Sequence, residues 1–457
     1  MKFGMASQAA CGFVGLGVLL LGQAAPGAAQ ASSDITFTRD IAPILQENCQ
    51  TCHRPESIAP MSLLTYEEVR PWARVIKLKV ETRKMPPWPI DKSIGVQDFK
   101  NDISLSDEEI ALISAWVDVG APQGNPEDMP APKEWPSYSE RWAYEDVFGR
   151  KPDLIIASDP YMVGANGLDH WPEPETLVEG LDGPRWIRAV EVRPGTPDTR
   201  YVFHHANPDL LQDGEDNSLV ESAVGTVGFI YPADSGKLIK PGSSVRFNMH
   251  LYPTDRDVEA TLQIGLWFYP EGETPNLATE GEVTFEIDQS TGFGLEDRGH
   301  STNPQLSNRG DLLIPPNSQA MYRGVYVMDR PARIHSLRGH MHLRGKYQVV
   351  ELIYPDGRWE VLNKLDWDHP WHTAFLYDDD AMPLLPKGTV VVLTSLFDNT
   401  AENPYNPDPR QWVAGGDRTV DEMSHLRMGI TYFDDEAEFE ALVRERERIN
   451  SEKEEAR

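Results

Sequence analysis

Two histidines separated by one residue, His340 and His342, stand before a segment with strand character. From 346 to 354 apolar and polar residues alternate, and a Pro-Asp-Gly turn follows at 355–357, so the segment is predicted to be a β-strand entering a hairpin. Residues two apart on a strand point to the same face, so both imidazoles could share one metal ion. Such a pair suits copper, zinc, iron or nickel. Two half-buried histidines bonded to carbonyl groups are the alternative.

A second chemical motif is Cys49-Gln50-Thr51-Cys52-His53. The Cys-x-x-Cys-His pattern is typical of c-type haem attachment: two thioethers hold the porphyrin edge and the histidine supplies an iron ligand. A thioredoxin-like redox pair and a coincidental match are the alternatives. The surrounding sequence has no βαβ pattern, and the only other cysteine, Cys11, lies in the N-terminal segment. We therefore expect Cys49, Cys52 and His53 to bind haem c.

The sixth iron ligand should be a methionine further along the chain. Met85 is the better candidate because Pro86 and Pro87 would fix its loop, and Met61 is the alternative. Residues 105–117 are predicted to form a helix, with Ser106 as N-cap and acidic residues in the first turn. This helix resembles the C-terminal helix of small class I cytochromes c.

Three further histidines lie in apolar, strand-like surroundings: His204 and His205 after Tyr-Val-Phe, and His250 within 245–252. Neighbouring strand residues point to opposite faces. His204 and His205 could therefore share a metal only through a distorted backbone or through different ring nitrogens.

Chain length and net charge limit the number of domains and the kinds of partner. The 457 residues are enough for about three domains, and the net charge of −30 argues against nucleic acid and anionic membrane surfaces as partners. Residues 1–31 are predicted to be a cleaved signal peptide, with Lys2, a short apolar run and an Ala-x-Ala site. An uncleaved anchor is the alternative. The expected destination is a bacterial periplasm, without stable membrane insertion after cleavage.

Beyond residue 152, short strand-like runs separated by Pro, Gly and Asp continue for nearly three hundred residues. Regular short strands of this kind favour β-sandwiches, and the length suits two in tandem with a boundary near 285.

From about 152 to 434 the sequence resembles the copper type II, ascorbate-dependent monooxygenases, the family of peptidylglycine α-hydroxylating monooxygenase and dopamine β-monooxygenase. The resemblance lies in the His-His pair, the later histidine, the His-x-His pair and the segment 415–423 that ends in Asp-Glu-Met, all in the family's order. It implies one copper bound by His204, His205 and His250 for electron transfer. It implies a second, oxygen-activating copper bound by His340, His342 and Met423, with Met423 preferred to Met428.

The resemblance also bears on the substrate. In the peptide-hydroxylating branch, an arginine two residues before the His-x-His holds a substrate carboxylate, and Arg338 stands at that position. An ion-paired strand arginine is the alternative. The residues after the methionine differ from the family's, so the substrate is expected to be a small organic molecule of unknown identity. His335, His369, His372 and His425 are expected to be structural or surface histidines.

The complete expectation is a multidomain fold: a small all-α cytochrome c domain followed by two tandem antiparallel β-sandwich, jelly-roll-like copper domains. The expected divisions are signal peptide 1–31, cytochrome c domain 32–124, linker 125–151, N-terminal copper sandwich 152–285, C-terminal copper sandwich 286–434 and charged terminal helix 435–457.

The expected function is a copper monooxygenase that hydroxylates a C–H bond with O2, with haem c passing electrons from a periplasmic donor. The alternatives are a copper- and haem-bearing electron-transfer or copper-handling protein, and a haem-linked oxidase that releases peroxide.

Overall fold

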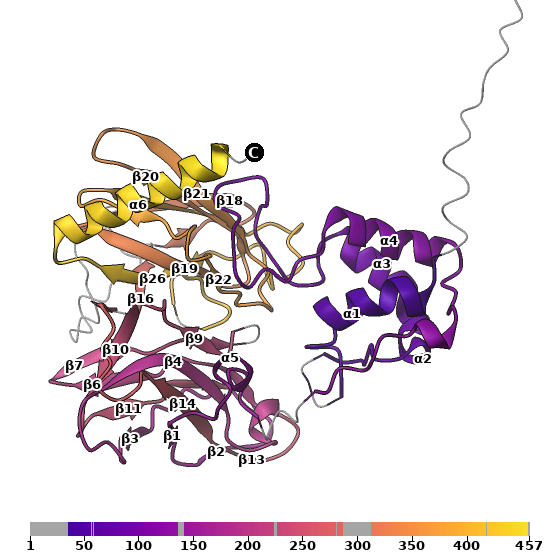
Figure 1. Ribbon diagram of the computed structural model, residues 1–457. Coiled ribbons are helices and arrows are strands. Elements are labelled where there is room, and N and C mark those ends of the chain that lie inside the picture. Colours follow the sequence, from indigo (N-terminus) through magenta and orange to yellow (C-terminus); the bar gives the residue numbers. More distant parts are fainter. Residues whose placement is uncertain are drawn as a thin grey trace, which may run out of the picture.

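The computed structural model describes residues 35–55, 57, 59–135, 141–223, 226–279, 281–286, 312–416 and 418–455. The predicted signal peptide, 1–31, lies outside these residues. Figure 1 shows a helical unit (35–85 and 103–135), a first β-unit (141–279) and a second β-unit (281–286 and 312–455). Within the described part of the chain, no helix has the length and apolar character needed to cross a membrane.

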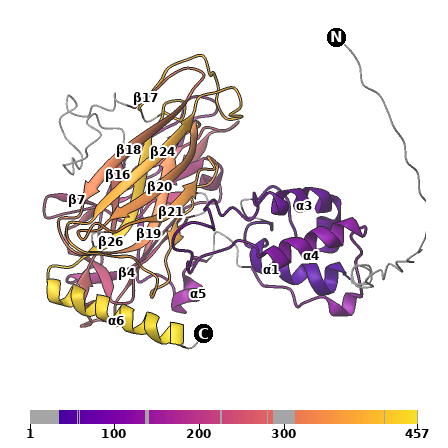
Figure 2. The same ribbon diagram turned by 90° about the horizontal axis from the view of Figure 1, so that it is seen from above.

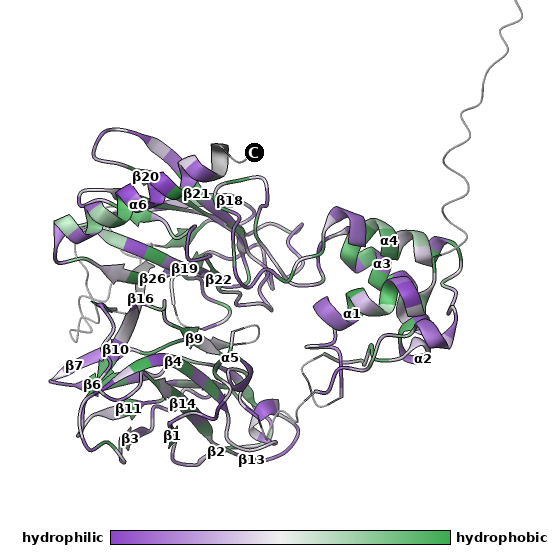
Figure 3. Ribbon diagram, in the orientation of Figure 1, coloured by the Kyte–Doolittle hydropathy of each residue, from purple (hydrophilic) through white to green (hydrophobic). Residues whose placement is uncertain are grey.

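The helical unit is built from short helices. Ser106 caps the longest of them through a capping box with Glu109. Figure 3 shows hydrophobic residues on α3 (Ala73–Glu81) and α4 (Asp107–Asp118), and Ile76, Ile113 and Trp116 of these helices belong to the core of the unit. The elements are η1 Phe37–Ile41, α1 Ala42–Asn48, α2 Tyr66–Val69, η2 Arg70–Trp72, α3 Ala73–Glu81, α4 Asp107–Asp118 and η3 Pro126–Asp128.

Residues 86–102, which we call the arm, leave the helical unit between α3 and α4 and pack on the second β-unit (Figures 1 and 2). Isolated antiparallel bridges join Ile90 to Leu365 and Phe99 to Tyr377. The arm passes so close to this unit that a Cβ on Gly95, whose φ is +73°, would lie 1.8 Å from the carbonyl oxygen of residue 362. Only glycine fits there without moving the backbone.

The predicted fold class is wrong, because residues 32–124 do not form an all-α cytochrome c domain. Helices make up only 18% of the residues that the structure describes, which are mostly β-sheet. Helical spacing at 41–48 and a capped helix at 105–117 indicated an all-α domain. The segment between α3 and α4 is not helical, and its Trp88, Ile90 and Phe99 are buried in the core of the second β-unit instead of a helical core.

The first β-unit has two main sheets around one apolar core. One sheet has the order β1-β14-β4-β10-β15 with β9 on β4, another the order β3-β11-β6-β7, and a small third sheet the order β12-β5-β8. The short helix α5, Glu145–Phe148, precedes the strands. The strands are β1 Leu154–Ala157, β2 Tyr161–Val163, β3 Glu175–Leu177, β4 Arg185–Pro194, β5 Phe203–Ala206, β6 Asp209–Gln212, β7 Glu215–Ser218, β8 Ser222–Ala223, β9 Gly228–Ile230, β10 Ser235–Ile239, β11 Ser244–Arg246, β12 Met249–Leu251, β13 Val258–Ala260, β14 Leu262–Phe268 and β15 Leu277–Ala278.

The second β-unit packs a sheet of order β16-β26-β19-β22, with β23 on β19, against a sheet of order β18-β24-β20-β21. The C-terminal helix α6, Glu436–Glu455, packs through Phe439 on Phe433 and Leu277. The strands are β16 Gly281–Glu286, β17 Leu313–Ile314, β18 Gln319–Val327, β19 Ala332–Met341, β20 Gly345–Ile353, β21 Trp359–Asp366, β22 Phe375–Leu376, β23 Leu384–Leu385, β24 Val390–Asp398, β25 Val413–Ala414 and β26 Ser424–Tyr432.

The predicted strand through His340 and His342 is interrupted. β19 ends at Met341, and the chain turns before β20 begins in the other sheet at Gly345. The carboxylate of the buried Glu422 accepts the backbone N–H groups of His342 (2.9 Å) and Arg344 (2.6 Å). These two N–H groups therefore cannot form strand hydrogen bonds. The turn is stabilised by Glu422, which lies about 80 residues further along the chain and cannot be predicted from the local sequence pattern.

Candidate metal centres

The first histidine cluster consists of His204, His205 and His250 on the paired strands β5 and β12. Their nitrogens lie close together: His250 Nδ1 is 3.3 Å from His204 Nδ1 and 3.1 Å from His205 Nε2. One ligand atom from each residue lies within 4.8 Å of the others. The three imidazoles therefore surround a single point.

A β-bulge explains how two adjacent histidines face the same point. His250 pairs with His205, but Leu251 pairs with Phe203, so His204 is the extra residue at the register shift. The two histidines also present different ring nitrogens, Nδ1 of His204 and Nε2 of His205.

Groups behind this cluster fix two of its rings. His250 Nε2 lies 3.3 Å from Asp169 Oδ2, and the Trp171 ring stacks on His250 with centres 4.7 Å apart. The Tyr252 hydroxyl lies 3.4 Å from His204 Nε2. A carboxylate on the outer nitrogen of a ligand histidine is the usual way in which proteins orient that ligand.

The second cluster lies on β19 and β26. His340 pairs directly with His425, and their ring centres are 5.7 Å apart. The His342 ring centre lies 5.2 Å from that of His340. The last pair of the ladder is Met341 with Ser424, and Met423 is the residue just before β26. His340 and His425, which are directly paired, therefore point to the same face of the sheet.

Two further residues belong to the second cluster: Glu221, which no sequence motif marks, and His372, which was expected to be a structural or surface histidine. Ligand atoms of Glu221, His340 and His372 lie within 4.8 Å of one another. Glu221 comes from the first β-unit, just before β8, and His372 lies in the loop between β21 and β22. Neither residue follows a strand pattern or ligand spacing, so no local signal pointed to them.

Arg338 is a buried ion-paired residue, with 1% of its surface exposed. Its Nη2 lies 3.4 Å from Glu221 Oε2, and its Nη1 donates to the Glu221 backbone carbonyl at 3.0 Å. Arg427 Nε lies 2.8 Å from the same carboxylate oxygen. The ion-paired alternative for Arg338 therefore describes its position in this structure.

Burial keeps four of these histidines, His204, His205, His340 and His342, in the neutral form. Burial, followed by the neighbouring imidazoles, lowers the pKa of His204 to about 3, and burial lowers the pKa of His342 to about 4. Burial also lowers the pKa of His205 and His340 well below the usual value. A histidine must be neutral to bind a metal, so all four are in the ligating state at neutral pH.

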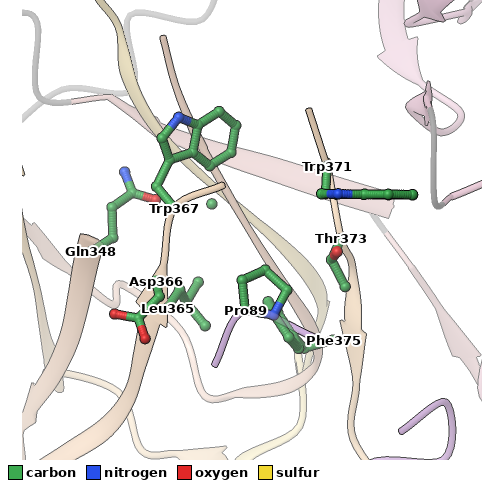
Figure 4. A pocket seen from close by; sticks show the side chains of 9 residues that line it. Pro89, Gln348, Leu365, Asp366, Trp367, Trp371, Thr373 and Phe375 are labelled. Atoms are coloured by element: carbon green, nitrogen blue, oxygen red, sulfur yellow. The ribbon is translucent and has the colours of Figure 1, made fainter. Parts of the chain in front are cut away.

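Trp367 connects the second cluster to a small pocket at the base of the arm. Its ring centre lies 5.8 Å from His340 and 5.4 Å from His372, and its Nε1 donates to the His342 carbonyl at 2.8 Å. Figure 4 shows Trp367 and Trp371 at one side of the pocket and Pro89 of the arm at the other. The pocket is lined by Pro89, Gly339, Gln348, Leu365, Asp366, Trp367, Trp371, Thr373 and Phe375.

The Cys-x-x-Cys-His motif lies at the end of α1. Cys49 and Cys52 are not joined in a disulfide, and the N–H groups of Cys52 and His53 donate to the Cys49 carbonyl at 3.1 and 2.9 Å. His53 Nδ1 lies 3.2 Å from the Met61 carbonyl oxygen. If Nδ1 carries the proton for this bond, Nε2 is left as the nitrogen that can bind a metal. Met85 follows α3 at the start of the arm.

No family model and no curated protein matches this chain. Similar solved structures include PNGase F, a glycosylasparaginase from Flavobacterium meningosepticum, at 11% identity and a TM-score of 0.30 over 62% of this chain and 97% of that one. The major capsid protein P2 from bacteriophage PM2 matches at 10% identity and a TM-score of 0.28 over 62% and 99% of the chains. These scores are too low to transfer a fold family or a function.

Proposed function

We propose that the chain is a periplasmic two-copper monooxygenase of the copper type II family, which hydroxylates a small organic substrate with O2 and receives electrons through covalently bound haem c. The observation that carries this proposal is the meeting of two groups of partly or fully buried imidazoles at the boundary between the two β-units.

The donor atoms fit copper. Two nitrogens about 2.0 Å from one ion at a tetrahedral angle lie about 3.3 Å apart, and the first cluster has separations of 3.1 and 3.3 Å. In the second cluster, Nδ1 of His340 is buried without a hydrogen-bond partner among the described residues. His204, His205 and His250 would hold one copper, and His340, His342 and Met423 the other. Imidazole and thioether ligands suit copper in both oxidation states, and the bound metal would supply the redox chemistry.

The proposal does not include the substrate-binding role that the family resemblance suggested for Arg338. Its guanidinium is buried against Glu221, so binding a substrate carboxylate there would require breaking a buried ion pair. The proposed substrate class is therefore a small organic molecule without a carboxylate at this position.

Several contacts support haem attachment at Cys49, Cys52 and His53. Burial raises the pKa of the Cys49 thiol to about 12, which disfavours the thiolate that a dithiol redox pair requires. The Met61 carbonyl lies on the Nδ1 side of His53, and iron would lie on the Nε2 side. This arrangement favours Met85 over Met61 as the sixth ligand.

Metal analysis of the purified chain tests the proposal. After incubation with copper and dialysis, we expect two coppers per haem. One copper per haem would favour the electron-transfer or copper-handling alternative, and haem without retained copper would overturn the enzymatic proposal. Oxygenation is then tested with a panel of C–H substrates under ¹⁸O2, with ascorbate as reductant. Label in a product supports monooxygenation, whereas oxygen uptake with peroxide and unlabelled products supports the oxidase alternative.

A further inference from the structure

His372 lies between the two histidine clusters. Its ring centre is 5.0 Å from that of His340, 5.9 Å from that of His204 and 6.2 Å from that of His205. The side chain is buried, with 4% of the residue exposed. Two imidazoles bound to one ion at about 2.0 Å have ring centres about 5 Å apart, so His372 and His340 have the separation of two ligands of one metal.

The first β-unit fixes the position of His372. The Thr226 hydroxyl donates to the His372 backbone carbonyl at 3.0 Å, and His372 Nδ1 lies 3.4 Å from Glu221 Oε1. Because Nδ1 faces the carboxylate, Nε2 is the nitrogen left to bind an ion. A carboxylate behind a histidine is the typical arrangement for a metal ligand and the group that orients it.

Glu221 forms ion pairs with two arginines. Its second carboxylate oxygen lies 2.8 Å from Arg427 Nε and 3.4 Å from Arg338 Nη2. Two guanidinium groups offset its charge, so the carboxylate is a weak donor to a cation. Its remaining oxygen faces His372, and this makes Glu221 a positioning residue and not a ligand.

We infer that His372 is a third imidazole ligand of the metal at His340 and His342, and that Glu221 positions it from the other β-unit. This inference rests on the proposed function, since it concerns the same metal. It implies that a residue of the first β-unit orients a ligand of the second centre, and that the donor set of this centre is richer in nitrogen than the two histidines and one methionine of the family resemblance.

Zinc binding to the full-length, haem-bearing, copper-free chain tests this inference, with a chromogenic chelator as competitor. We expect the wild-type chain to bind two ions, and His372→Ala and His372→Gln to bind the second ion at least tenfold more weakly. The backbone contact with Thr226 is kept in both variants. Glu221→Gln should weaken the second ion by about 10- to 100-fold without changing the stoichiometry. Far-UV circular dichroism and the haem spectrum check that each variant is folded.

His369→Ala is the matched control, because His369 lies in the same loop and also faces Trp367, with ring centres 6.4 Å apart, but belongs to neither cluster. It should bind both ions as the wild type does. The nitrogen hyperfine pattern in the electron paramagnetic resonance spectrum of the copper(II)-loaded chain should lose one nitrogen in His372→Gln.

Wild-type zinc affinity and an unchanged hyperfine pattern in folded His372 variants would overturn the inference while leaving the two-metal proposal intact. A wild-type chain that binds no metal would overturn both.

Discussion

One extra residue in a strand decides the geometry of the first cluster. Without the bulge between β5 and β12, His204 and His205 would point to opposite faces of the sheet. The sequence indicated that these two side chains could meet only with a distorted backbone or different ring nitrogens, and the structure has both. The bulge itself could not be predicted, because it depends on how β12 pairs with β5 and not on the local sequence.

Loss of the Met423 thioether should abolish oxygenation without changing the haem. Met423→Ile keeps the apolar volume but removes the sulfur. If Met423 holds the second copper, hydroxylation should fall by at least 100-fold, while the haem absorption spectrum should stay the same because the motif 49–53 lies in the helical unit. Product formation under ¹⁸O2 and the visible spectrum measure the two effects. Met428→Ile is the control, since Met428 is buried in the apolar core of the second β-unit. Equal product formation by Met423→Ile and wild type would contradict the assignment.

A buried carboxyl in the first β-unit should make its stability depend on pH. Burial raises the pKa of Glu191 to about 7, although the N–H groups of Ala143 and Tyr144 donate to it at 2.8 and 2.9 Å and act in the opposite direction. The folded-state pKa lies above the unfolded value of 4.5. The stability that the protonated Glu191 carboxyl contributes is therefore fully present below pH 4.5 and is lost as pH rises through 7. The free energy of unfolding should fall by roughly 3 kcal/mol over this range.

Glu191→Gln should remove this dependence, because an amide does not titrate. Urea unfolding followed by circular dichroism between pH 4.5 and 8 gives the free energy of unfolding of both chains. The wild-type value should fall relative to that of the variant as pH rises, and parallel curves would contradict the prediction.

Among the secondary-structure elements, α1 and α4 could be predicted from sequence periodicity, but the position of the arm could not. Helical spacing identified the segments that became α1 and α4, and the capping box at Ser106 marked the start of α4. Between them, Trp88, Ile90 and Phe99 have no helical or strand period, and their partners lie some 270 residues further along the chain. Local patterns carry no information about a partner so distant, and the expectation of a separate all-α domain failed there.

The arm should stabilise the second β-unit. Trp88 packs edge-to-face on Phe375 and Phe99, with ring centres 4.8 and 5.8 Å apart. Trp88→Ala would leave a cavity and should lower the free energy of unfolding by about 3–5 kcal/mol. Urea denaturation of the full-length chain measures this value. Trp72→Ala provides the control, since 42% of Trp72 is exposed and a change within about 0.5 kcal/mol is expected. Equal effects of the two substitutions would show that the arm does not stabilise this unit.

At the scale of the molecule, the two β-units meet through buried charge as well as through apolar surface. Glu221 of the first unit contacts Arg338, Arg427 and His372 of the second, and Asp234 forms a two-point ion pair with Arg333 at 2.6 and 2.9 Å. Residue spacing marked out His340 and His342, but Glu221 and His372 come together only through this packing.

If haem and copper are both bound, the whole chain should transfer electrons internally. When the haem of the oxidised, copper-loaded chain is reduced by a laser flash, it should be reoxidised at a rate independent of protein concentration. The copper-free chain under the same anaerobic conditions should keep its haem reduced. Haem that stays reduced in the copper-loaded chain throughout turnover would show that it is not the electron source.

The path of the chain around the arm has a consequence for such a reaction. The helical unit is joined to the second β-unit twice, because the arm goes out to that unit and returns from it (Figures 1 and 2). A carrier on one flexible tether samples many separations from its acceptor and gives a spread of rates. A carrier held by both ends of the arm keeps nearly one separation, so electron delivery from this unit should follow a single exponential.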